Sequence, residues 1–381
     1  MERIPESGTL KMYELASRLE AEGKTVYHFE VGQPDFPTPP NIVEAAIQAL
    51  KDGETRYTSS RGIPKLLDAI QSHYSKRGIE INGQSDVIVT PGAKMALFQG
   101  VLSTIDAGDD VLLLAPAWPT YRVMIRIAGA KPRDVPTRPG YELDEEALKA
   151  HISKSVSAIV INSPNNPSGG ILAKEHMKLI FDLAMDHDFV VFSDEIYEAL
   201  VYDGLEQASM LEVDPAMQRT LVVSGFSKSY SMTGWRLGYA IGNSETIGNM
   251  VRIQQNTTSC ATSFVQHAGV EALTGDQSHV EAMRASFESR RNTTVQLLEE
   301  MEGVRCVNPK GAFYAFPDFS SFGLSCGTLA ELILKKTGVT TVPGDAFGRA
   351  YNHHLRFSYA TSLEIIEQGL GLLSEFLPSL M

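Results

Sequence analysis

Two cationic side chains follow an apolar segment in the stretch LVVSGFSKSYSMTGWRLGY, residues 221–239, where Lys228 and Arg236 stand eight residues apart. A lysine just past a buried strand can extend its flexible stem and remain an ordinary surface cation. A partly desolvated lysine instead loses its proton more readily and becomes a nucleophile toward carbonyl carbons. An arginine stays charged and can hold a phosphate through paired hydrogen bonds. The stretch therefore offers an amine for covalent chemistry beside a cation for an anionic group.

Further residues of chemical interest follow three other apolar segments. VTPGAK places Gly92 and Ala93 where a strand ends and a helix begins, and free N–H groups at such a turn suit a phosphate. Trp118 in APAWPTYR is either a core residue or a flat surface for a planar ligand. Taken singly, an ordinary strand-to-helix turn explains Gly92 and Ala93 better than a phosphate site does, and a core position explains Trp118 better than a ligand surface does. Asn166 lies among the turn-forming residues of NSPNNPSGG, where its amide can donate to a ligand oxygen.

A carboxylate and a phenol complete the set. Asp194 and Tyr197 end the segment FVVFSDEIY. A carboxylate after four apolar residues either caps a helix or needs a cationic partner or hydrogen bonds to remain charged. Together the residues supply a phosphate cradle, an indole, an amide, a phenol, a carboxylate, an amine and a guanidinium. Pyridoxal phosphate needs this inventory for its phosphate, planar ring, phenolic oxygen, ring nitrogen and aldehyde.

The elements that position these residues are predicted from their apolar patterns. The expected strands are DVIVT (86–90), DVLLLAP (110–116), AIVINSP (158–164), FVVFSD (189–194), TLVVSG (220–225) and LGYAIG (237–242). Helical spacing is found between them, for example over Ala93–Ile105 and Lys174–Asp186. Apolar strands separated by helices indicate a mainly parallel sheet that is covered on both faces. Ligands of such sheets gather at the carboxyl ends of the strands, where the residues above lie.

The pattern changes after about Thr274. Residues 277–301 predict one long helix, and the remainder predicts a smaller α+β unit with strands near GAFYAFPDF and LRFSYA. The N-terminal stretch MERIPESGTLKMYELASRLEAEGK is expected to form a loop and then an amphipathic helix. We therefore expect a large domain over residues 46–276 and a small domain formed by residues 1–45 and 277–381.

Composition limits the classes of partner. The 381 residues are 43% hydrophobic, and 33 basic against 46 acidic residues give a net charge of −13, which disfavours nucleic acid and anionic membrane surfaces. No apolar run approaches the ~20 residues of a membrane span. Cys260, Cys306 and Cys326 are widely spaced and lack C-x-x-C spacing, so neither a disulfide framework nor a zinc site is predicted. We expect a cytoplasmic protein that holds no metal.

A series of motifs in a fixed order resembles one known family. They are GQPDFPTP (32–39), YTSSRGIP (57–64), TPGAKMAL, PAWPTY, NSPNNPSGG, SDEIY, SKSYSMTGWRLGY, PKGAFYAFP (309–317), VPGDAFG (342–348) and LRFSYA (355–360). Asn166 and Asp194 are 28 residues apart, and Asp194 and Lys228 are 34 apart. From end to end the chain resembles the class I/II aminotransferases of fold type I, in particular the aspartate and aromatic aminotransferases. The resemblance implies a large α/β domain with a mainly parallel seven-stranded sheet flanked by helices, and a smaller α+β domain.

The resemblance also assigns roles around the cofactor ring. Lys228 would bond covalently to pyridoxal phosphate and, once displaced by the substrate, move the proton as base and then acid. Asp194 would keep the pyridine nitrogen protonated, while Tyr197 and Asn166 would donate to the phenolic oxygen. Trp118 would stack on one ring face. Ile196 would close the other face, because it stands two residues after Asp194 in SDEIY and alternate residues of an extended chain project to one side.

The resemblance places the phosphate at the turn formed by Gly92, Ala93 and Lys94. Ser227 and Arg236 would assist, because this turn lacks the hydroxyl residue found in some related sequences. The part played by the Lys94 side chain is left open.

Substrate and subunit contacts follow from the same resemblance. Arg356 alternates with apolar neighbours in HLRFSYA, where a surface ion pair is the ordinary role, but the resemblance makes it the fork that binds the substrate α-carboxylate. The implied substrate-binding residues are Gly32, Trp118, Asn166 and Arg356. Tyr57 resembles a tyrosine that reaches the phosphate of a neighbouring subunit. The resemblance therefore implies a homodimer with shared active sites.

The implied function is transfer of an amino group from an L-amino acid, either aspartate or glutamate or an aromatic one, to a 2-oxo acid such as 2-oxoglutarate. A carbon–sulfur β-lyase is an alternative, because it begins with the same proton abstraction. A non-catalytic ligand-sensing module is another, although such regulators carry a DNA-binding domain first and only 31 residues precede GQPDFPTP. A nicotinamide enzyme is disfavoured by the lack of G-x-G-x-x-G after a strand.

Substrate choice depends on the remaining pocket residues. An acidic side chain needs a second cation, for which Arg61 is a candidate, although this arginine equally suits a surface role that supports its loop. Trp118 and Tyr121 would suit aromatic substrates. Aspartate or glutamate is narrowly favoured.

Overall fold

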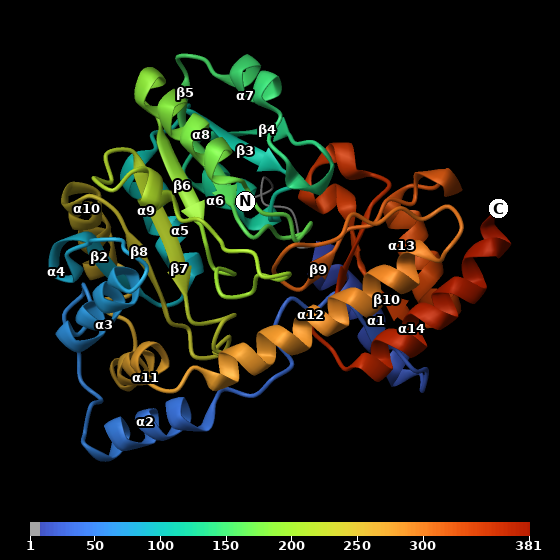
Figure 1. The fold of residues 1–381 in the computed structure, drawn as a ribbon, viewed down its shortest axis with the longest axis horizontal. Coiled ribbons are helices and arrows are strands. Elements are labelled where there is room, and N and C mark those ends of the chain that lie inside the picture. Colours follow the sequence, from blue (N-terminus) through green and yellow to red (C-terminus); the bar gives the residue numbers. More distant parts are fainter. Residues whose placement is uncertain (1–7) are drawn as a thin grey trace.

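A computed structural model describes residues 8–381 of the chain. Residues 1–7, which include the expected N-terminal loop and the start of the expected small domain, lie outside the described residues. Two layered parts lie side by side and the long helix α12 (Ser278–Glu299) runs from one to the other (Figure 1). This helix corresponds to the one predicted over residues 277–301.

The larger part is built on a seven-stranded sheet. In spatial order its strands are β2 (Val87–Thr90), β8 (Gly238–Ile241), β7 (Thr220–Gly225), β6 (Val190–Asp194), β5 (Val156–Asn162), β3 (Asp110–Ala115) and β4 (Lys131–Pro136). Only β8 runs antiparallel to its neighbours, β2 and β7. The predicted mainly parallel seven-stranded sheet is confirmed. The sequence reasoning missed β4, an edge strand with the sequence KPRDVP, in which only Val135 is buried.

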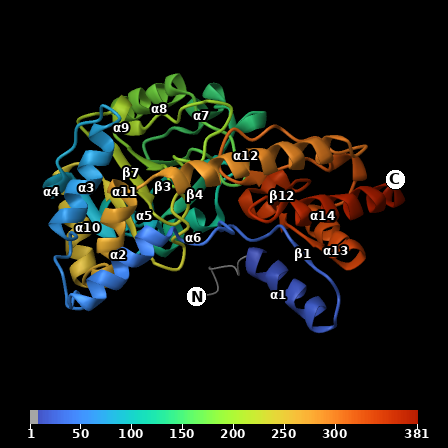
Figure 2. The same cartoon turned by 60° about the horizontal axis from the view of Figure 1, so that its bottom comes forward.

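Helices cover both faces of this sheet (Figures 1 and 2). They are α2 (Pro40–Lys51), α3 (Pro64–Ser75), α4 (Gly83–Asp86), α5 (Ala93–Thr104), α6 (Pro119–Ile127), α7 (Glu145–His151), α8 (Lys174–His187), α9 (Met210–Val213), α10 (Ser244–Gln255) and α11 (Ser263–Thr274). Side chains of a strand alternate between the faces. Along β3, Val111 and Leu113 join the core under α5, α6 and α10, whereas Leu112 and Leu114 join the core on the other face. Burial on both faces explains why this strand is continuously apolar.

The second part combines the N-terminal and C-terminal segments. Its other elements are α1 (Gly8–Ala21), β1 (Tyr27–His28), β9 (Tyr314–Ala315), α13 (Cys326–Thr337), β10 (Val339–Thr340), β11 (Val342–Pro343), β12 (Leu355–Ser358) and α14 (Leu363–Phe376). β1 pairs with β10, and β11, β12 and β9 form an antiparallel sheet. A separate apolar core holds these elements together and also takes in Ile196 and Tyr197 from the larger part. The expected division at residues 46 and 276 stays a prediction; its first boundary would fall inside α2, which packs as one helix against α11 of the larger part.

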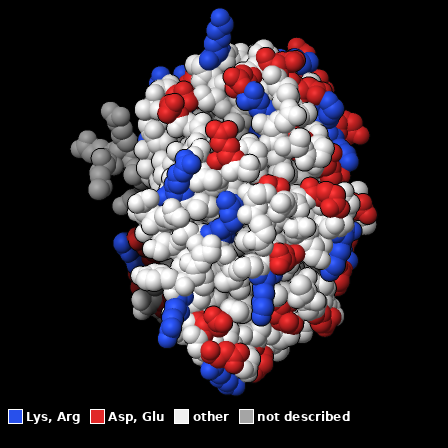
Figure 3. Space-filling model, turned by 90° about the vertical axis from the view of Figure 1, so that its left-hand side faces the viewer, with Lys and Arg blue, Asp and Glu red and all other residues white. Residues whose placement is uncertain are grey.

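The surface of the described chain mixes both signs of charge. On the face drawn in Figure 3, basic and acidic side chains are interspersed among uncharged ones. Within residues 8–381, every helix is too short or too polar to cross a lipid bilayer.

Candidate active site

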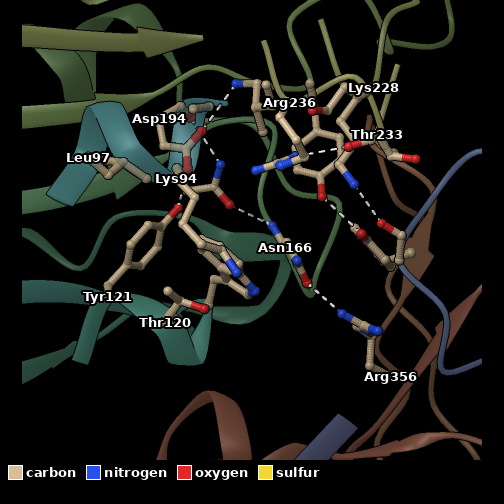
Figure 4. Close-up of a pocket in the computed structure, with 18 residues that line it drawn as sticks. Lys94, Leu97, Thr120, Tyr121, Asn166, Asp194, Lys228, Thr233, Arg236 and Arg356 are labelled. Atoms are coloured by element: carbon tan, nitrogen blue, oxygen red, sulfur yellow. Dashed lines mark hydrogen bonds between the residues drawn. The ribbon is translucent and has the colours of Figure 1, made fainter. Parts of the chain in front are cut away.

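A cavity of about 560 Å³ opens at the carboxyl ends of β5, β6 and β7, where they face the second part of the chain (Figure 4). Twelve of the predicted site residues line it, namely Gly32, Ala93, Lys94, Trp118, Asn166, Asp194, Ile196, Tyr197, Ser227, Lys228, Arg236 and Arg356. They come from both parts of the chain, so the fold brings together residues that are up to 324 positions apart in sequence.

Lys228 projects into the cavity from the loop that follows β7. Its Nζ donates a hydrogen bond to the backbone oxygen of Gly32 at 2.6 Å. Burial, aided by the positive charge of Arg356 and opposed by Asp194, lowers the pKa of the Lys228 amine from 10.5 to about 7. A substantial fraction of this amine is therefore neutral and nucleophilic near pH 7, unlike that of a surface lysine.

Asp194 is the last residue of β6 and is buried. Its Oδ2 accepts a hydrogen bond from the Tyr121 hydroxyl at 2.6 Å, and its Oδ1 accepts one from the backbone N–H of Ile196 at 3.2 Å. Burial raises the pKa of the carboxyl to about 6, against the opposing effect of these bonds and of Lys228. A turn follows β6, so Asp194 does not cap a helix. The carboxylate is held in place by neutral donors and is suited to a cationic ligand group.

Asn166 follows β5 and is held from two sides. Its backbone N–H donates to Oδ1 of Asn162 at 2.8 Å, and Asn162 in turn donates from Nδ2 to the backbone oxygen of Asp194 at 3.0 Å. Its own Oδ1 accepts from Nη1 of Arg356 at 3.1 Å (Figure 4). Because an arginine only donates, the amide oxygen is engaged and the NH₂ group remains as a donor.

Tyr197 lines the same cavity and pairs with a second phenol. Its hydroxyl lies 2.9 Å from the hydroxyl of Tyr314. Burial holds the pKa of the Tyr197 phenol well above its usual range, so the group is protonated at neutral pH and available as a donor.

Arg356 lies on β12 and is 3% exposed, which excludes a surface ion pair. Its Nη2 donates to the backbone oxygen of Glu30 at 2.6 Å, close to Gly32 in sequence. The guanidinium packs on the ring of Tyr314, with Cζ 4.6 Å from the ring centroid. Nε has no hydrogen-bond partner among residues 8–381. A buried cation with an unused donor, facing a cavity, is suited to a carboxylate.

The start of α5 forms a cradle with Arg236. Gly92 caps the helix with φ +83° and without a side-chain hydrogen bond, which leaves N–H groups of the first turn open. A Cβ atom at Gly92 would lie 2.4 Å from Nη2 of Arg236, so only glycine lets the guanidinium approach so closely. Nη1 of Arg236 donates to the backbone oxygen of Thr233 at 2.9 Å. Helix end and guanidinium together form an anion site, and Ser227 is a further polar residue of the cavity lining.

Trp118 and Ile196 form part of the wall. The Trp118 side chain is half-buried, since it packs against the core beneath α5 and α6 on one side and lines the cavity on the other. Nζ of Lys94 lies 5.0 Å from the centre of its ring system. Whether Trp118 and Ile196 cover the two faces of a bound ring stays a prediction.

Three other residues named from the sequence lie outside the cavity wall. Gly92 lies just behind it, against Arg236. Tyr57 is 88% exposed and borders a separate open depression with Cys260 and Phe264. Arg61 donates from Nη1 to the backbone oxygens of Ser85 at 2.8 Å and Val87 at 3.1 Å, so it supports its own loop.

The cavity carries an excess of positive charge. Its charged lining residues are the four cations Lys94, Lys228, Arg236 and Arg356 and the single carboxylate Asp194. This contrasts with the net charge of −13 of the whole chain. The site is therefore expected to attract ligands with more than one anionic group.

The sequence reasoning missed five lining residues and gave a sixth, Tyr121, another role. Tyr121 was expected to suit aromatic substrates, but its hydroxyl instead holds Asp194. Tyr314 contacts both Tyr197 and Arg356. Both tyrosines stand inside the motifs PAWPTY and PKGAFYAFP, which were the available signals. The other lining residues are Leu97, Thr120, Asn162 and Thr233.

Comparisons with known proteins agree along the whole chain. The family described as aminotransferase class I and II matches residues 24–371. An aromatic-amino-acid aminotransferase 2 of Thermococcus litoralis is 36% identical, over 99% of this chain and 97% of that protein. A probable aspartate/prephenate aminotransferase of Aquifex aeolicus is 40% identical, over 96% and 94%. A solved structure of aspartate aminotransferase from Thermus thermophilus with maleate is 37% identical, has a TM-score of 0.94, and matches over 99% and 98%.

Proposed function

Because the chain belongs to the aminotransferase class I and II family, we propose that its cavity moves the amino group of aspartate or glutamate to a 2-oxo acid such as 2-oxoglutarate. The chain is an amino-acid aminotransferase that uses pyridoxal phosphate, the cofactor of its family. A non-catalytic sensing module is therefore excluded. The choice of a dicarboxylic substrate, the roles of the residues and the subunit arrangement are the proposal.

The residues of the cavity fit pyridoxal phosphate. The anion site of Gly92, the first turn of α5 and Arg236 would hold the phosphate, and a side chain at Gly92 would fill that site. The buried carboxylate of Asp194, held only by neutral donors, would face the ring nitrogen. When bound, the cofactor supplies the electron sink that withdraws charge from the substrate α-carbon.

Proton transfer falls to the residues that surround the ring. Lys228, with a pKa of about 7, would take the proton from the substrate α-carbon through Nζ and later return one. Asp194 would hold a proton on the ring nitrogen, because a buried carboxylate favours a cationic partner. Tyr197 and the NH₂ group of Asn166 would donate to the phenolic oxygen and hold the ring in a fixed position.

Two cations would bind the substrate. Arg356, buried and fixed by Asn166 and by the backbone of Glu30, would take the α-carboxylate with its remaining donors.

The proposal of a dicarboxylic substrate depends on the position of Lys94. Its ammonium lines the cavity beside Trp118, and among residues 8–381 no carboxylate lies within ion-pair distance of it. Burial and Arg236 lower the pKa of Lys94, so an anionic ligand group would stabilise its charged form.

The decisive experiment follows the bound cofactor. Purified holoenzyme is mixed with single amino acids without an oxo acid, and loss of its visible absorbance band is recorded. We expect aspartate and glutamate to react with the highest kcat/KM. Faster reaction with phenylalanine or tyrosine would favour the aromatic alternative, for which the half-buried Trp118 provides the surface. Release of pyruvate and ammonia from a cysteine conjugate would favour the β-lyase.

The proposed assembly is a homodimer with shared sites. Tyr57 is 88% exposed, which is unusual for a large aromatic residue, and it borders an open depression of about 680 Å³. In a dimer this tyrosine would reach the phosphate of the neighbouring subunit. Sedimentation equilibrium tests the mass, and Tyr57→Phe is expected to weaken cofactor binding without dissociating the dimer.

We also propose that the protein works in the cytoplasm. Cys260, Cys306 and Cys326 are all free, and the last two are buried. Unpaired thiols fit a reducing compartment. Cell fractionation with an antibody against the chain tests the location.

A further inference from the structure

Tyr314 connects two halves of the proposed site. It lies on β9 with 1% of its surface exposed, and it borders the cavity. Its hydroxyl is 2.9 Å from that of Tyr197, while its ring supports the guanidinium of Arg356 at 4.6 Å. A Cβ atom at Gly32 would lie 2.8 Å from the same hydroxyl, so the loop that carries Gly32 passes directly over it. One buried side chain therefore touches the residues proposed for the phenolic oxygen and for the carboxylate.

The two phenols have a preferred direction of donation. Each hydroxyl has one proton to donate and two lone pairs to accept with. If Tyr197 donated to Tyr314, it would have no proton left for a ligand in the cavity. If Tyr314 donates to Tyr197 instead, Tyr197 accepts that bond and keeps its own proton to donate into the cavity. The latter arrangement also gives the Tyr314 proton an acceptor.

The electrostatic environment favours the same direction. Burial raises the pKa of both phenols. Arg356 lowers the pKa of both phenols and packs directly on the Tyr314 ring, whereas Asp194 raises the pKa of Tyr197 alone. Tyr314 is therefore the more acidic phenol and the better donor of the pair.

We propose that Tyr314 is a positioning residue with two separable functions. Its hydroxyl donates to Tyr197 and thereby directs and strengthens donation from Tyr197 to the cofactor's phenolic oxygen. Its ring holds the Arg356 guanidinium in the plane that receives the substrate α-carboxylate. The inference rests on the proposed roles of Tyr197 and Arg356.

The hydroxyl function is tested by a pH titration of the visible absorbance band of the holoenzyme. The band changes when a proton shared with the phenolic oxygen is lost. A hydrogen bond donated to this oxygen stabilises the deprotonated form and so lowers the pH at the midpoint of the titration. Tyr314→Phe weakens the donor, so we expect the midpoint to rise by about 0.5 to 1 pH unit, the equivalent of one neutral hydrogen bond. The KM for the amino acid should change by less than about twofold, because the ring remains.

The matched control is Tyr202→Phe. Tyr202 is a fully buried tyrosine of the same core, its hydroxyl donates to the backbone oxygen of Ala312, and it does not border the cavity. This variant loses a buried tyrosine hydroxyl as Tyr314→Phe does, yet its midpoint should stay at the wild-type value. An equal shift in both variants, or no shift in Tyr314→Phe, overturns the hydroxyl function.

The ring function is tested by comparing Tyr314→Leu with Tyr314→Phe. Both lack the hydroxyl, so their midpoints should agree, but only the leucine variant removes the nearer of the two rings that pack on Arg356; Phe347, at 5.4 Å, remains in both. We expect its KM for the amino acid to rise by about 5- to 20-fold above that of the phenylalanine variant, as for a lost, desolvated cation–π contact. Equal KM values in the two variants overturn this function.

Tyr197→Phe separates this inference from the proposed site. If Tyr197 donates to the phenolic oxygen, Tyr197→Phe raises the midpoint, and adding Tyr314→Phe raises it no further, because the two hydroxyls act in series. No shift in Tyr197→Phe would mean that the proposed role of Tyr197 is wrong. A shift in Tyr197→Phe with additive behaviour in the double variant would overturn only the coupling through Tyr314.

Discussion

The guanidinium of Arg356 donates from Nη1 to the amide oxygen of Asn166 at 3.1 Å and so joins β12 to the loop after β5. The bond fixes the orientation of the amide, because arginine only donates and therefore faces the oxygen. The NH₂ group of Asn166 is left to face a ligand. The residue proposed to bind the substrate carboxylate thus orients a residue proposed to bind the cofactor.

Replacing Asn166 tests this orientation. Asn166→Asp keeps an oxygen for Arg356 but replaces the donor by an anion near the phenolic oxygen. We expect kcat to fall by about 10²- to 10³-fold, as when one donor to a negative oxygen is removed. KM should change by less than about threefold, because Arg356 keeps its acceptor. Steady-state kinetics measures kcat and KM of this variant. Asn256→Asp, the same substitution at the exposed end of α10, is the control and should leave both constants unchanged. A change confined to KM in Asn166→Asp would contradict the proposed orientation.

The buried charge of Asp194, which the proposed reaction requires, is expected to lower the stability of the cofactor-free protein. Its folded pKa of about 6 lies above the ordinary value of 3.8, so the folded chain disfavours the charged form. The resulting loss of stability is absent at pH values below about 4, develops as the pH rises through about 6, and is complete above it. Asp194→Asn removes the charge but keeps an oxygen for the Tyr121 hydroxyl.

We therefore expect Asp194→Asn to raise the free energy of unfolding of the cofactor-free protein by about 1 to 3 kcal/mol at pH 7.5. At pH 4 the two proteins should be equally stable. The same variant should lose transaminase activity, because an amide cannot hold a proton on the ring nitrogen. Urea unfolding at the two pH values measures the difference, and a gain of equal size at both would show that the charge is not its cause.

How far the fold can be predicted depends on the burial of each strand. β3, β5, β6 and β7 are covered on both faces, and their continuous apolar runs made them recognisable. β4 pairs only with β3 and has one buried residue and two prolines, so its sequence resembles a loop. The sequence pattern of an edge strand says little about pairing, because backbone hydrogen bonds to the neighbouring strand, and not buried side chains, hold the strand in place.

The site could be predicted where chemistry determines the residue type, and not where packing does. Lys228 and Asp194 stand out because an amine or a carboxylate after a buried strand requires an explanation. Tyr314 and Tyr121 resemble core residues, and only contacts across 117 and 73 positions reveal their polar roles. The location of Arg61 was likewise undetermined, since sequence distance to Tyr57 does not show which way a long side chain turns.

Lys94 is predicted to select dicarboxylic substrates. Lys94→Met removes the charge but retains much of the chain length beside Trp118. We expect KM for aspartate to rise about tenfold, and KM for phenylalanine to change by less than about twofold, because only the first has a second carboxylate. Arg61→Gln is the control, since its side chain bonds to backbone oxygens away from the cavity and should affect thermal stability alone. Equal effects on both substrates would assign Lys94 to the cofactor instead.

The glycine at the start of α5 gives a test of the phosphate cradle that separates contact from backbone strain. Gly92 and Gly53 have almost the same φ, +83° and +82°, so alanine at either position is strained to a similar degree and should cost about 1 kcal/mol of stability. A Cβ atom at Gly92 meets Arg236 at 2.4 Å, whereas one at Gly53 has no atom within 4 Å. We therefore expect Gly92→Ala to raise the dissociation constant of pyridoxal phosphate by at least about tenfold, since Arg236 must move out of its phosphate-binding position. Gly53→Ala should leave that constant unchanged. Absorbance titration of the cofactor-free variants measures both constants, and similar values for the two would mean that strain, and not the position of Arg236, governs the cradle.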